Sequence, residues 1–374
     1  MKKIKLFTLM AILVFGMIML VGCEEETPAV QDPAQQGNVA PVANNDPAVD
    51  EGDTRVMTDQ AGRQVELAKE VNRVITTWRP STSLLFAIGG QEKLVAADTH
   101  STKNEFLLGV YPEIGNIPGI GNRKGLNLEE MVAAKPDVVF IWQGTDTEPV
   151  IKQLEQQGIA VFVLVPESQD DMKEATRLMG EIIGHQEQAE AAIAYYDNTV
   201  KMIVDKLAGV AKEDLPVAFM AGSGGLLNTV GGEYYQHFLI ENAGGKNAAA
   251  ELKGFGWQDI SAEQMVTWNP EYIFATQFFD ADLAEAVKSQ AGLQNVKAVQ
   301  EGKVYKFPAN ITSWDFPEPL SALGILWMAK TMHPDVFADL DFNAEVENYH
   351  KKFFGKTFTE LGGNLDESAP ITIK

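Results

Sequence analysis

Two stretches far apart in this chain follow the same design. Residues 127–141 have the sequence NLEEMVAAKPDVVFI, and residues 261–275 have the sequence SAEQMVTWNPEYIFA. In each, a side chain that can cap a helix, Asn127 or Ser261, precedes a glutamate in the first turn, where the helix dipole favours negative charge. A proline then ends the turn region, and an apolar strand follows. Two copies in matching register predict two similar lobes built from helices and strands.

The chain is long enough for two such lobes, because its 374 residues exceed the roughly 250 to 300 at which one hydrophobic core stops growing. Apolar, β-branched segments alternate with helical segments in both halves. The predicted strands span residues 71–76, 93–97, 138–142, 160–165, 217–221, 272–275 and 304–307. The predicted helices span residues 80–89, 128–134, 148–157, 236–243 and 262–267. This pattern predicts an α/β fold with two Rossmann-like lobes, each built on a mostly parallel sheet that helices cover on both faces.

A long helix is predicted between the two lobes. Residues 185–210 are rich in Ala and contain no Gly or Pro until Gly209. Ala192, Tyr196, Ile203 and Leu207, together with Thr199, recur there at helical spacing. A flexible linker would consist of Gly and Ser, so we expect one rigid helix that permits only small lobe rotation. The predicted boundaries are therefore 54–184 for the N-terminal lobe, 185–210 for the helix and 211–374 for the C-terminal lobe.

The first residues have the composition of an export signal. Three lysines precede an apolar run, residues 6–21, which ends at Leu20-Val21-Gly22-Cys23. By length alone the run is also compatible with a short membrane helix. Cys23 is the only cysteine of the chain and stands where bacterial lipoproteins carry their lipid, so we interpret residues 1–22 as a lipoprotein signal peptide and Cys23 as the lipidated residue.

The segment that follows Cys23 is predicted to be a disordered tether. Residues 23–53 consist mainly of Glu, Pro, Gln, Asn and Ala, with almost no side chain to bury. The protein is then expected outside the cytoplasm, lipid-anchored to the outer face of the cell membrane or in the periplasm. The formal net charge of −22 excludes nucleic acid as a partner, because phosphate binding requires a basic surface. We expect a monomer.

Over most of the chain, short motifs occur in an order and spacing that resemble one protein family. These motifs are DQAGRQVEL, VNRVITT, AIGGQEKLVAA, IPGIGNRKGLNLEEMVAAKPDVVFI, LIENAGGKNAAAE, ISAEQMVTWNPEYIFA, AVQEGKVYKFP and GILWMAKTMHPDVF. Together they are similar to the substrate-binding proteins of ABC importers for iron complexes, haem and cobalamin. The resemblance implies two α/β lobes, one rigid helix and a ligand cleft between the lobes. It also implies that Glu129 and Glu263, one from each lobe, dock into basic pockets of the permease dimer.

Candidate ligand-binding residues lie in the loops that follow the predicted strands, where open α/β sheets bind their ligands. Aromatic side chains are concentrated there more than core packing alone explains, although any one of them can also be a packing residue. The candidates are Trp78, Arg79, His100, Arg123, Trp142, Tyr234, Tyr235, Trp257, Phe278 and Trp314. Further cleft-loop residues are Asp98, Gln143, Ser223, Gln277, Ser313 and Asp315.

The two repeats favour different ligands. Arg123 stands six residues before Glu129, where the resemblance to ferric-siderophore receptors implies an arginine that binds chelate oxygens. A surface ion pair is the other interpretation of Arg123. Trp257 stands six residues before Glu263, where cobalamin receptors carry tryptophan. We therefore expect a receptor that delivers a ferric-siderophore-type iron complex to an ABC permease, with a corrinoid or haem as the alternative ligand and no intrinsic cofactor.

Other functions have weaker support in the sequence. Haem would need an axial Tyr or His such as His100, Tyr234 or Tyr235, and the family's usual haem position holds Asn122 here. The histidines lack metal-ligand spacing, so a bare metal site is not expected. Asp98 and His100 resemble an acid and base pair, but no nucleophile accompanies them. We therefore expect a binding protein and not an enzyme or an adhesive surface protein.

Overall fold

The computed structural model describes residues 53–122, 125–143, 147–254, 256–277, 279, 282–308, 310–365 and 370–371. The predicted signal peptide with Cys23, most of the predicted tether, Arg123 and Phe278 lie outside these ranges. Across the ranges described, no helix is both long enough and apolar enough to cross a membrane.

The N-terminal lobe contains a parallel sheet in the order β4-β3-β7-β8. Its strands are β3 (Val74–Thr76), β4 (Leu94–Ala97), β7 (Val138–Trp142) and β8 (Ala160–Leu164). Val74 and Phe140 face one apolar cluster, whereas Ile75 and Ile141 face another. Both faces of the sheet are therefore buried, as the continuous apolar strands predicted.

Among the described residues, five α-helices and two small hairpins complete the N-terminal lobe. The helices are α1 (Arg79–Ala87), α2 (Glu105–Val110), α3 (Leu128–Ala133), α4 (Glu148–Gln156) and α5 (Gln169–Ile183). A capping box between Ser168 and Asp171 begins α5, and Gly184 ends it with φ 78°. The hairpins pair β1 (Thr54–Thr58) with β2 (Gln64–Ala68) and β5 (Gly121–Asn122) with β6 (Gly125–Leu126). Neither hairpin was among the elements predicted from the sequence.

The C-terminal lobe repeats the same sheet, here in the order β11-β9-β13-β14. Its parallel strands are β9 (Val217–Ala221), β11 (Lys246–Asn247), β13 (Tyr272–Ala275) and β14 (Val304–Lys306). Its short helices are α7 (Tyr235–Asn242), α8 (Ala262–Trp268), α9 (Leu283–Ser289) and α10 (Lys297–Gln300). An antiparallel pair, β10 (Asn228–Val230) with β12 (Trp257–Asp259), forms a separate small sheet. The predicted fold, two α/β lobes with parallel sheets, is confirmed.

The internal repeat extends to the capping hydrogen bonds of the two copies. Asn127 accepts a hydrogen bond from the third residue of α3, and Ser261 accepts the equivalent bond in α8. Met131 and Met265, each two residues after a repeated glutamate, are both fully buried. The helices of the two copies are therefore fixed by the same cap and the same apolar contact.

The backbone between helix and strand is repeated as well. Lys135 and Asn269 both have positive φ, 45° and 46°, and they are the only described residues other than glycine that do so. The acidic residue two positions later binds a backbone N–H at the start of a neighbouring strand in both lobes, just before β3 or at the first residue of β9. Asp137 Oδ2 accepts the Arg73 N–H at 2.8 Å, and Glu271 Oε1 accepts the Val217 N–H at 3.2 Å. The two sequence stretches therefore encode the same three-dimensional unit.

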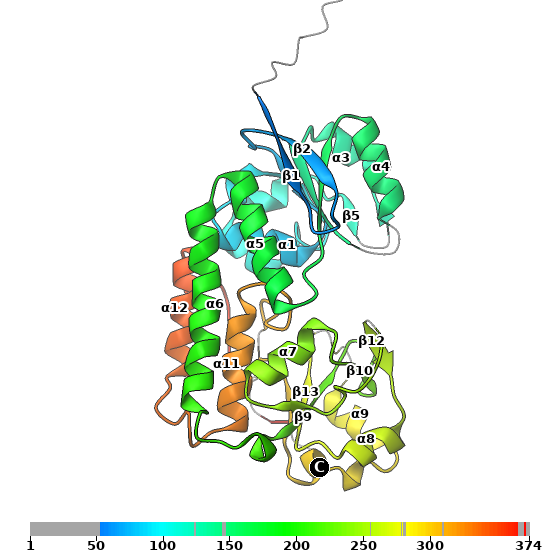
Figure 1. Ribbon diagram of the computed structural model, residues 1–374, viewed down its shortest axis with the longest axis vertical. Helices are drawn as coiled ribbons and strands as arrows, with labels where there is room; N and C mark the ends of the chain where they lie inside the picture. The colour runs from blue at the N-terminus through cyan, green and yellow to red at the C-terminus, as the bar shows by residue number, and fades with distance from the viewer. Residues whose placement is uncertain are drawn as a thin grey trace, which may run out of the picture. The chain divides into compact units, whose positions relative to one another are not determined.

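Helices from distant parts of the chain lie side by side along the two lobes (Figure 1). They are α6 (Gln186–Lys206), α11 (Ser321–Met332) and α12 (Phe342–Phe354). The helix predicted at residues 185–210 is α6, and it packs against α5 and α11. Helix α12 lies within the predicted C-terminal lobe, 211–374, but the ring of its Phe354 lies 4.9 Å from the ring of Phe106 in α2. The chain returns to the first lobe because one face of α12 is apolar and needs a partner.

One apolar cluster connects both lobes. It runs from Val74 and Phe140 in the first sheet, through Tyr196 in α6, to Met220 and Phe274 in the second sheet. Polar contacts reinforce the connection, because the Asn242 side chain in α7 donates to Gln169 in α5 at 2.7 Å and to the Tyr196 hydroxyl at 3.3 Å. The lobes therefore do not have separate cores on this side of the molecule.

We predict that both lobes unfold in one cooperative transition, because they share a core. Asn242→Ala should lower the free energy of unfolding by about 1–2 kcal/mol, because Gln169 then loses its hydrogen-bond donor. Urea unfolding followed in parallel by circular dichroism and tryptophan fluorescence checks both points. Asn198→Ala, on the exposed face of α6, is the control and should change the free energy little. Two separate transitions would contradict a shared core.

Candidate functional site

A cavity of about 390 Å³ lies where the strands of both sheets end at their carboxyl termini. Open α/β sheets usually bind ligands at this edge. The described lining from the first lobe consists of Trp78, Trp142, Gln143, Pro166 and Glu167. The second lobe contributes Ser223, Tyr234, Tyr235, Gln236, Trp257 and Thr276. The loop between β14 and α11 adds Asp315, Phe316 and Pro317.

One wall of the cavity is a cluster of aromatic rings. Trp78 follows β3 and caps α1, and Trp142 is the last residue of β7. The centroids of these two indole rings lie 4.1 Å apart at an interplanar angle of 71°. Phe316, from the loop before α11, lies 5.2 Å from Trp78. The strand ends thus hold a rigid apolar surface toward the cavity.

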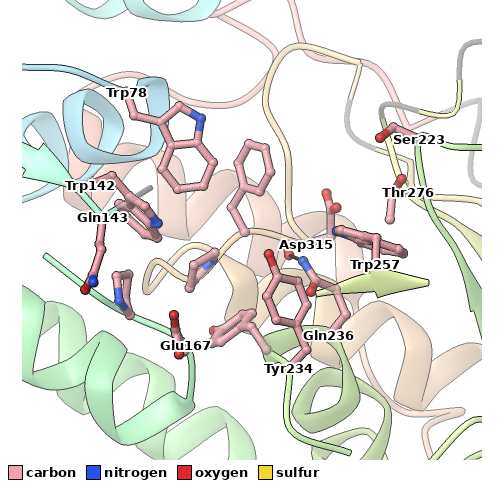
Figure 2. A pocket seen from close by; sticks show the side chains of 14 residues that line it. Trp78, Trp142, Gln143, Glu167, Ser223, Tyr234, Gln236, Trp257, Thr276 and Asp315 are labelled. Atoms are coloured by element: carbon pink, nitrogen blue, oxygen red, sulfur yellow. Dashed lines mark hydrogen bonds between the residues drawn. The ribbon is translucent and has the colours of Figure 1, made fainter. Parts of the chain in front are cut away.

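The opposite wall, near β12, has a second aromatic pair (Figure 2). The ring centroids of Tyr234 and Trp257 lie 6.3 Å apart at an interplanar angle of 76°. Gly222, just after β9, makes this arrangement possible, because a Cβ atom there would lie 2.2 Å from Trp257 Cε3. No residue but glycine leaves room for the indole at this position.

The polar side chains in the described lining are acidic or neutral. Burial and the charge of Asp171 raise the pKa of Glu167. Burial raises the pKa of Asp315 to about 6, against backbone hydrogen bonds and the charge of Arg79. None of the described lining residues is Arg, Lys or His. The cavity therefore offers aromatic faces and hydrogen-bond acceptors but no cation from those residues.

A buried group of charges lies behind the aromatic wall. Arg79, the first residue of α1, donates from Nη2 to Ser313 Oγ at 3.0 Å, and its guanidinium carbon lies 5.6 Å from the Phe316 centroid. Burial lowers the pKa of Arg79, whereas the charges of Glu318 and Asp315 raise it. Glu318 is 2% exposed, and burial raises its pKa to about 8. Arg79 thus connects the first lobe to a loop of the second through a desolvated charge cluster.

Five of the residues predicted to bind ligand line the cavity, namely Trp78, Trp142, Tyr234, Tyr235 and Trp257. Tyr235 is almost fully buried, and its hydroxyl hydrogen-bonds to Ser321 Oγ at 2.7 Å. Arg79 and His100 line a different cavity of about 480 Å³, together with Lys103. The backbone N–H of His100 donates to Asp98 Oδ1 at 3.1 Å, so the Asp98 carboxylate holds this loop in a turn.

Trp314 does not line the cavity, contrary to its placement among the ligand-binding candidates. Its side chain is fully buried, with ring centroids 5.9 Å from Phe342 and 5.8 Å from Phe358. Helix α11 approaches the loop closely at Gly324, where a Cβ atom would lie 2.3 Å from the Trp314 carbonyl oxygen. This approach directs Trp314 toward α12, while its neighbours Asp315 and Phe316 face the cavity.

Sequence reasoning missed several lining residues. Glu167 follows β8 and Thr276 follows β13, so the rule that selected Trp78 would also have selected them. Gln236 and Phe316 each directly follow a residue that had been selected. Whether Gln236 and Phe316 line the cavity depends on the orientation of α7 and of the loop before α11. No local sequence pattern specifies that orientation.

The two repeated glutamates are exposed, and neither is among the described residues that line the cavity. Glu129 is in the first turn of α3 and Glu263 in the first turn of α8. A hydrogen bond from its own backbone N–H and one from the Ser261 side chain lower the pKa of Glu263. Figure 1 shows α3 and α8 in different lobes, both on the side away from α6.

Comparison with known proteins agrees with this architecture. The family model described as "Periplasmic binding protein" matches residues 74–311, well over half of the chain. The molybdate-binding protein MolA of Haemophilus influenzae is 26% identical over 81% of this chain and 92% of its own. The structure of MolA bound to molybdate has a TM-score of 0.72, with 25% identity over 81% of this chain and 98% of that chain.

Two further relatives have different descriptions. The uncharacterized ABC transporter substrate-binding lipoprotein YvrC of Bacillus subtilis is 24% identical over 88% of this chain and 98% of its own. The vitamin B12-binding protein of Yersinia pestis is 27% identical over 55% of this chain and 70% of its own. Two of these relatives are thus named for different ligands, molybdate and vitamin B12, and YvrC is named for none.

The buried Glu318 gives a prediction about pH. Its pKa is raised from 4.5 to about 8, so the folded state binds a proton that the unfolded state releases as pH rises above 4.5. The stability from this group is therefore present at low pH and is lost as pH rises through about 8. We predict that Glu318→Gln reduces the fall in stability between pH 5.5 and 8.5, as measured by urea midpoints. An unchanged fall would contradict the assignment.

Proposed function

Because this chain belongs to the periplasmic binding protein family, we propose that it is the receptor of an ABC importer and captures a bulky metal chelate between its lobes. The membership itself makes it a substrate-binding protein of an ABC transporter. The proposal about its ligand rests on one observation, which is that aromatic side chains from both lobes face one cavity. Flat aromatic rings suit a large ligand with apolar faces better than a small hydrated ion.

The charge of the described lining narrows the ligand class. Glu167 and Asp315 are carboxylic residues, and no Arg, Lys or His accompanies them among the described lining residues. A carboxylate repels a ligand of the same sign, and the repulsion grows as water is excluded. We therefore propose a ferric siderophore without net negative charge, such as a trihydroxamate. By the same argument an oxyanion such as molybdate is a poor fit.

A corrinoid is the second candidate ligand. Trp257 lies on one wall of the cavity, and Trp78 and Trp142 lie on the opposite wall (Figure 2). This arrangement suits a wide, flat macrocycle, because each of its two faces can contact an aromatic ring. Tyr235 has little support as an axial haem ligand, because its hydroxyl is hydrogen-bonded to Ser321 and burial raises its pKa well above its ordinary value. To bind iron as a phenolate, Tyr235 would have to give up that environment.

Delivery of the ligand to the permease would depend on exposed residues of both lobes. We propose that Glu129 and Glu263 dock onto basic pockets of the permease dimer, because each lobe exposes one at the same place in the repeat. We also propose that Cys23 carries the lipid that keeps the protein at the outer face of the membrane. No chemical step is proposed, so the chelate should be recovered unchanged after binding.

The ligand proposal predicts that ferrioxamine B or cyanocobalamin quenches the tryptophan fluorescence of the protein at a one-to-one ratio. Trp257→Ala should weaken that binding by at least about tenfold, because it removes one aromatic wall. Trp314→Phe is the matched control, since Trp314 is buried away from the cavity, and it should change stability but not affinity. Binding that is insensitive to Trp257→Ala would place the ligand elsewhere.

Arg123 separates the two ligand classes in the same titration. If the chelate is a ferric siderophore, Arg123→Ala should weaken its binding at least about tenfold, because a guanidinium binds chelate oxygens with paired donors. If the chelate is a corrinoid, the substitution should have little effect. Enzymatic conversion of the chelate in this assay would overturn the receptor assignment itself.

The docking proposal predicts that Glu129→Ala combined with Glu263→Ala abolishes uptake while ligand affinity stays the same. The reason is that each charge supplies one of two contacts with the permease. Uptake of labelled chelate into cells and fluorescence titration of the purified variant check the two halves. Glu130→Ala combined with Gln264→Ala is the matched control, because both residues are exposed neighbours. Normal uptake by the first variant would rule out this docking site.

A further inference from the structure

Two polar side chains meet at the inner side of the cavity, close to Tyr234 and Trp257 (Figure 2). Gln236 is the second residue of α7, and Asp315 belongs to the loop between β14 and α11. The Nε2 atom of Gln236 donates to the backbone carbonyl oxygen of Asp315 at 2.9 Å. This bond fixes the orientation of the amide, because the carbonyl accepts only from the nitrogen side.

Each of these side chains keeps a buried acceptor atom without a protein partner. Gln236 is 4% exposed and Asp315 is 1% exposed. Their Oε1 and Oδ1 atoms have no hydrogen-bond partner within the described part of the chain. An unpaired buried polar atom costs about 1–3 kcal/mol, so two in one place need an explanation.

The fold itself does not account for the Asp315 acceptor. The charge of Arg79 and backbone N–H groups of Asp315 and Gln277 act on the Asp315 carboxyl, yet its Oδ1 atom has no hydrogen-bond partner among the described residues. The loop is already held by Ser313, which accepts from Arg79 and hydrogen-bonds to Gln277. Because both Asp315 and Gln236 line the cavity, the group that satisfies their free acceptors has to come from the cavity side.

We propose that Gln236 Oε1 and Asp315 Oδ1 form an acceptor subsite that selects a chelate carrying an N–H donor, either an ammonium or a primary amide. This inference rests on the proposed function and names a chemical feature of its ligand. An ionised carboxylate and an amide oxygen accept only, so the complementary group must donate. A primary amide has two N–H donors on one nitrogen and an ammonium has three, so one group carries enough donors for both acceptors.

The same subsite would reject related chelates that lack the donor. A ligand ester or ether at this place leaves both acceptors desolvated and unpaired, and a ligand carboxylate is also repelled by Asp315. Sites built around buried polar groups discriminate more strongly than apolar pockets do, because the wrong ligand strands those groups. We therefore expect selectivity to come from this side of the cavity, while the aromatic walls supply affinity.

Two matched pairs of chelates test the subsite by tryptophan fluorescence titration above pH 7. The first pair is ferrioxamine B, which ends in an ammonium, and its deamino analogue. The second pair is dicyanocobinamide, which carries primary amides, and heptamethyl dicyanocobyrinate, in which esters replace them. In the pair that the protein binds, we expect the donor-bearing member to bind at least about tenfold more tightly.

Two variants show whether the preference comes from these atoms. Asp315→Asn should lower the preference for the donor-bearing chelate. The asparagine amide presents either an N–H donor or an uncharged acceptor in place of the carboxylate. Gln236→Met removes the other acceptor while Asp315 stays, so it gives an independent result if either variant folds poorly. Asp339→Asn, an exposed aspartate that ion-pairs with Lys206, is the matched control and should keep the full preference.

The outcomes separate this inference from the proposed function. Equal affinity for both members of a pair, or a preference that survives both variants, would overturn the subsite and leave the receptor function standing. Failure of every chelate to bind would overturn the proposed ligand class and the subsite with it. A preference that both variants lower, while the control keeps it, would support the subsite.

Discussion

The structure depends on one apolar core that the two lobes share. It reaches from the first sheet beneath α6 and α11 to the second sheet, and Tyr196 lies fully buried within it. A lobe cannot rotate far about α6 without exposing part of this surface, at a cost of about 25 cal/mol per Å² of apolar area. Residue pairs such as Gln169 and Asn242 reinforce the same connection. On the opposite side, the carboxyl ends of the strands from both lobes line the cavity.

The charges near the cavity follow from the same arrangement. Arg79 begins a helix of the first lobe, yet its hydrogen bond goes to Ser313 in a loop of the second. Asp315 and Glu318 lie beside it, and burial raises their pKa values to about 6 and about 8, so at neutral pH the negative charge belongs mainly to Asp315. A desolvated ion cluster adds little net stability but strongly penalises the loss of one partner. It therefore serves better as a fixed geometric connection between loop and lobe than as a source of stability.

Local rules predicted the elements well and the site only in part. Strands 138–142, 217–221 and 272–275 have the predicted bounds, because a buried parallel strand needs a continuous apolar run. Residues at strand ends, such as Trp78 and Trp142, were identified because topology alone places them at the cavity. Trp314 was misplaced because a residue in a loop before a helix can face either side. Which side it faces depends on the packing of Gly324 and α12.

The sequence by itself determined the duplication. Both copies of the repeated stretch contain the same parts in the same order. These parts are a helix-capping residue, a glutamate, a buried methionine, a turn residue before proline, and an apolar strand. Each part is required by the local structure at its own position, so it can be recognised in the sequence of both copies. The sequence also determined the parallel sheets and the long helix. Continuous apolar runs indicate the buried strands, and residues at helical spacing indicate the helix. Only the tertiary structure decided that α12 returns to the first lobe and that Gln236 and Asp315 face each other. Those contacts join segments far apart in the chain, and the packing energy that selects them has no local signature.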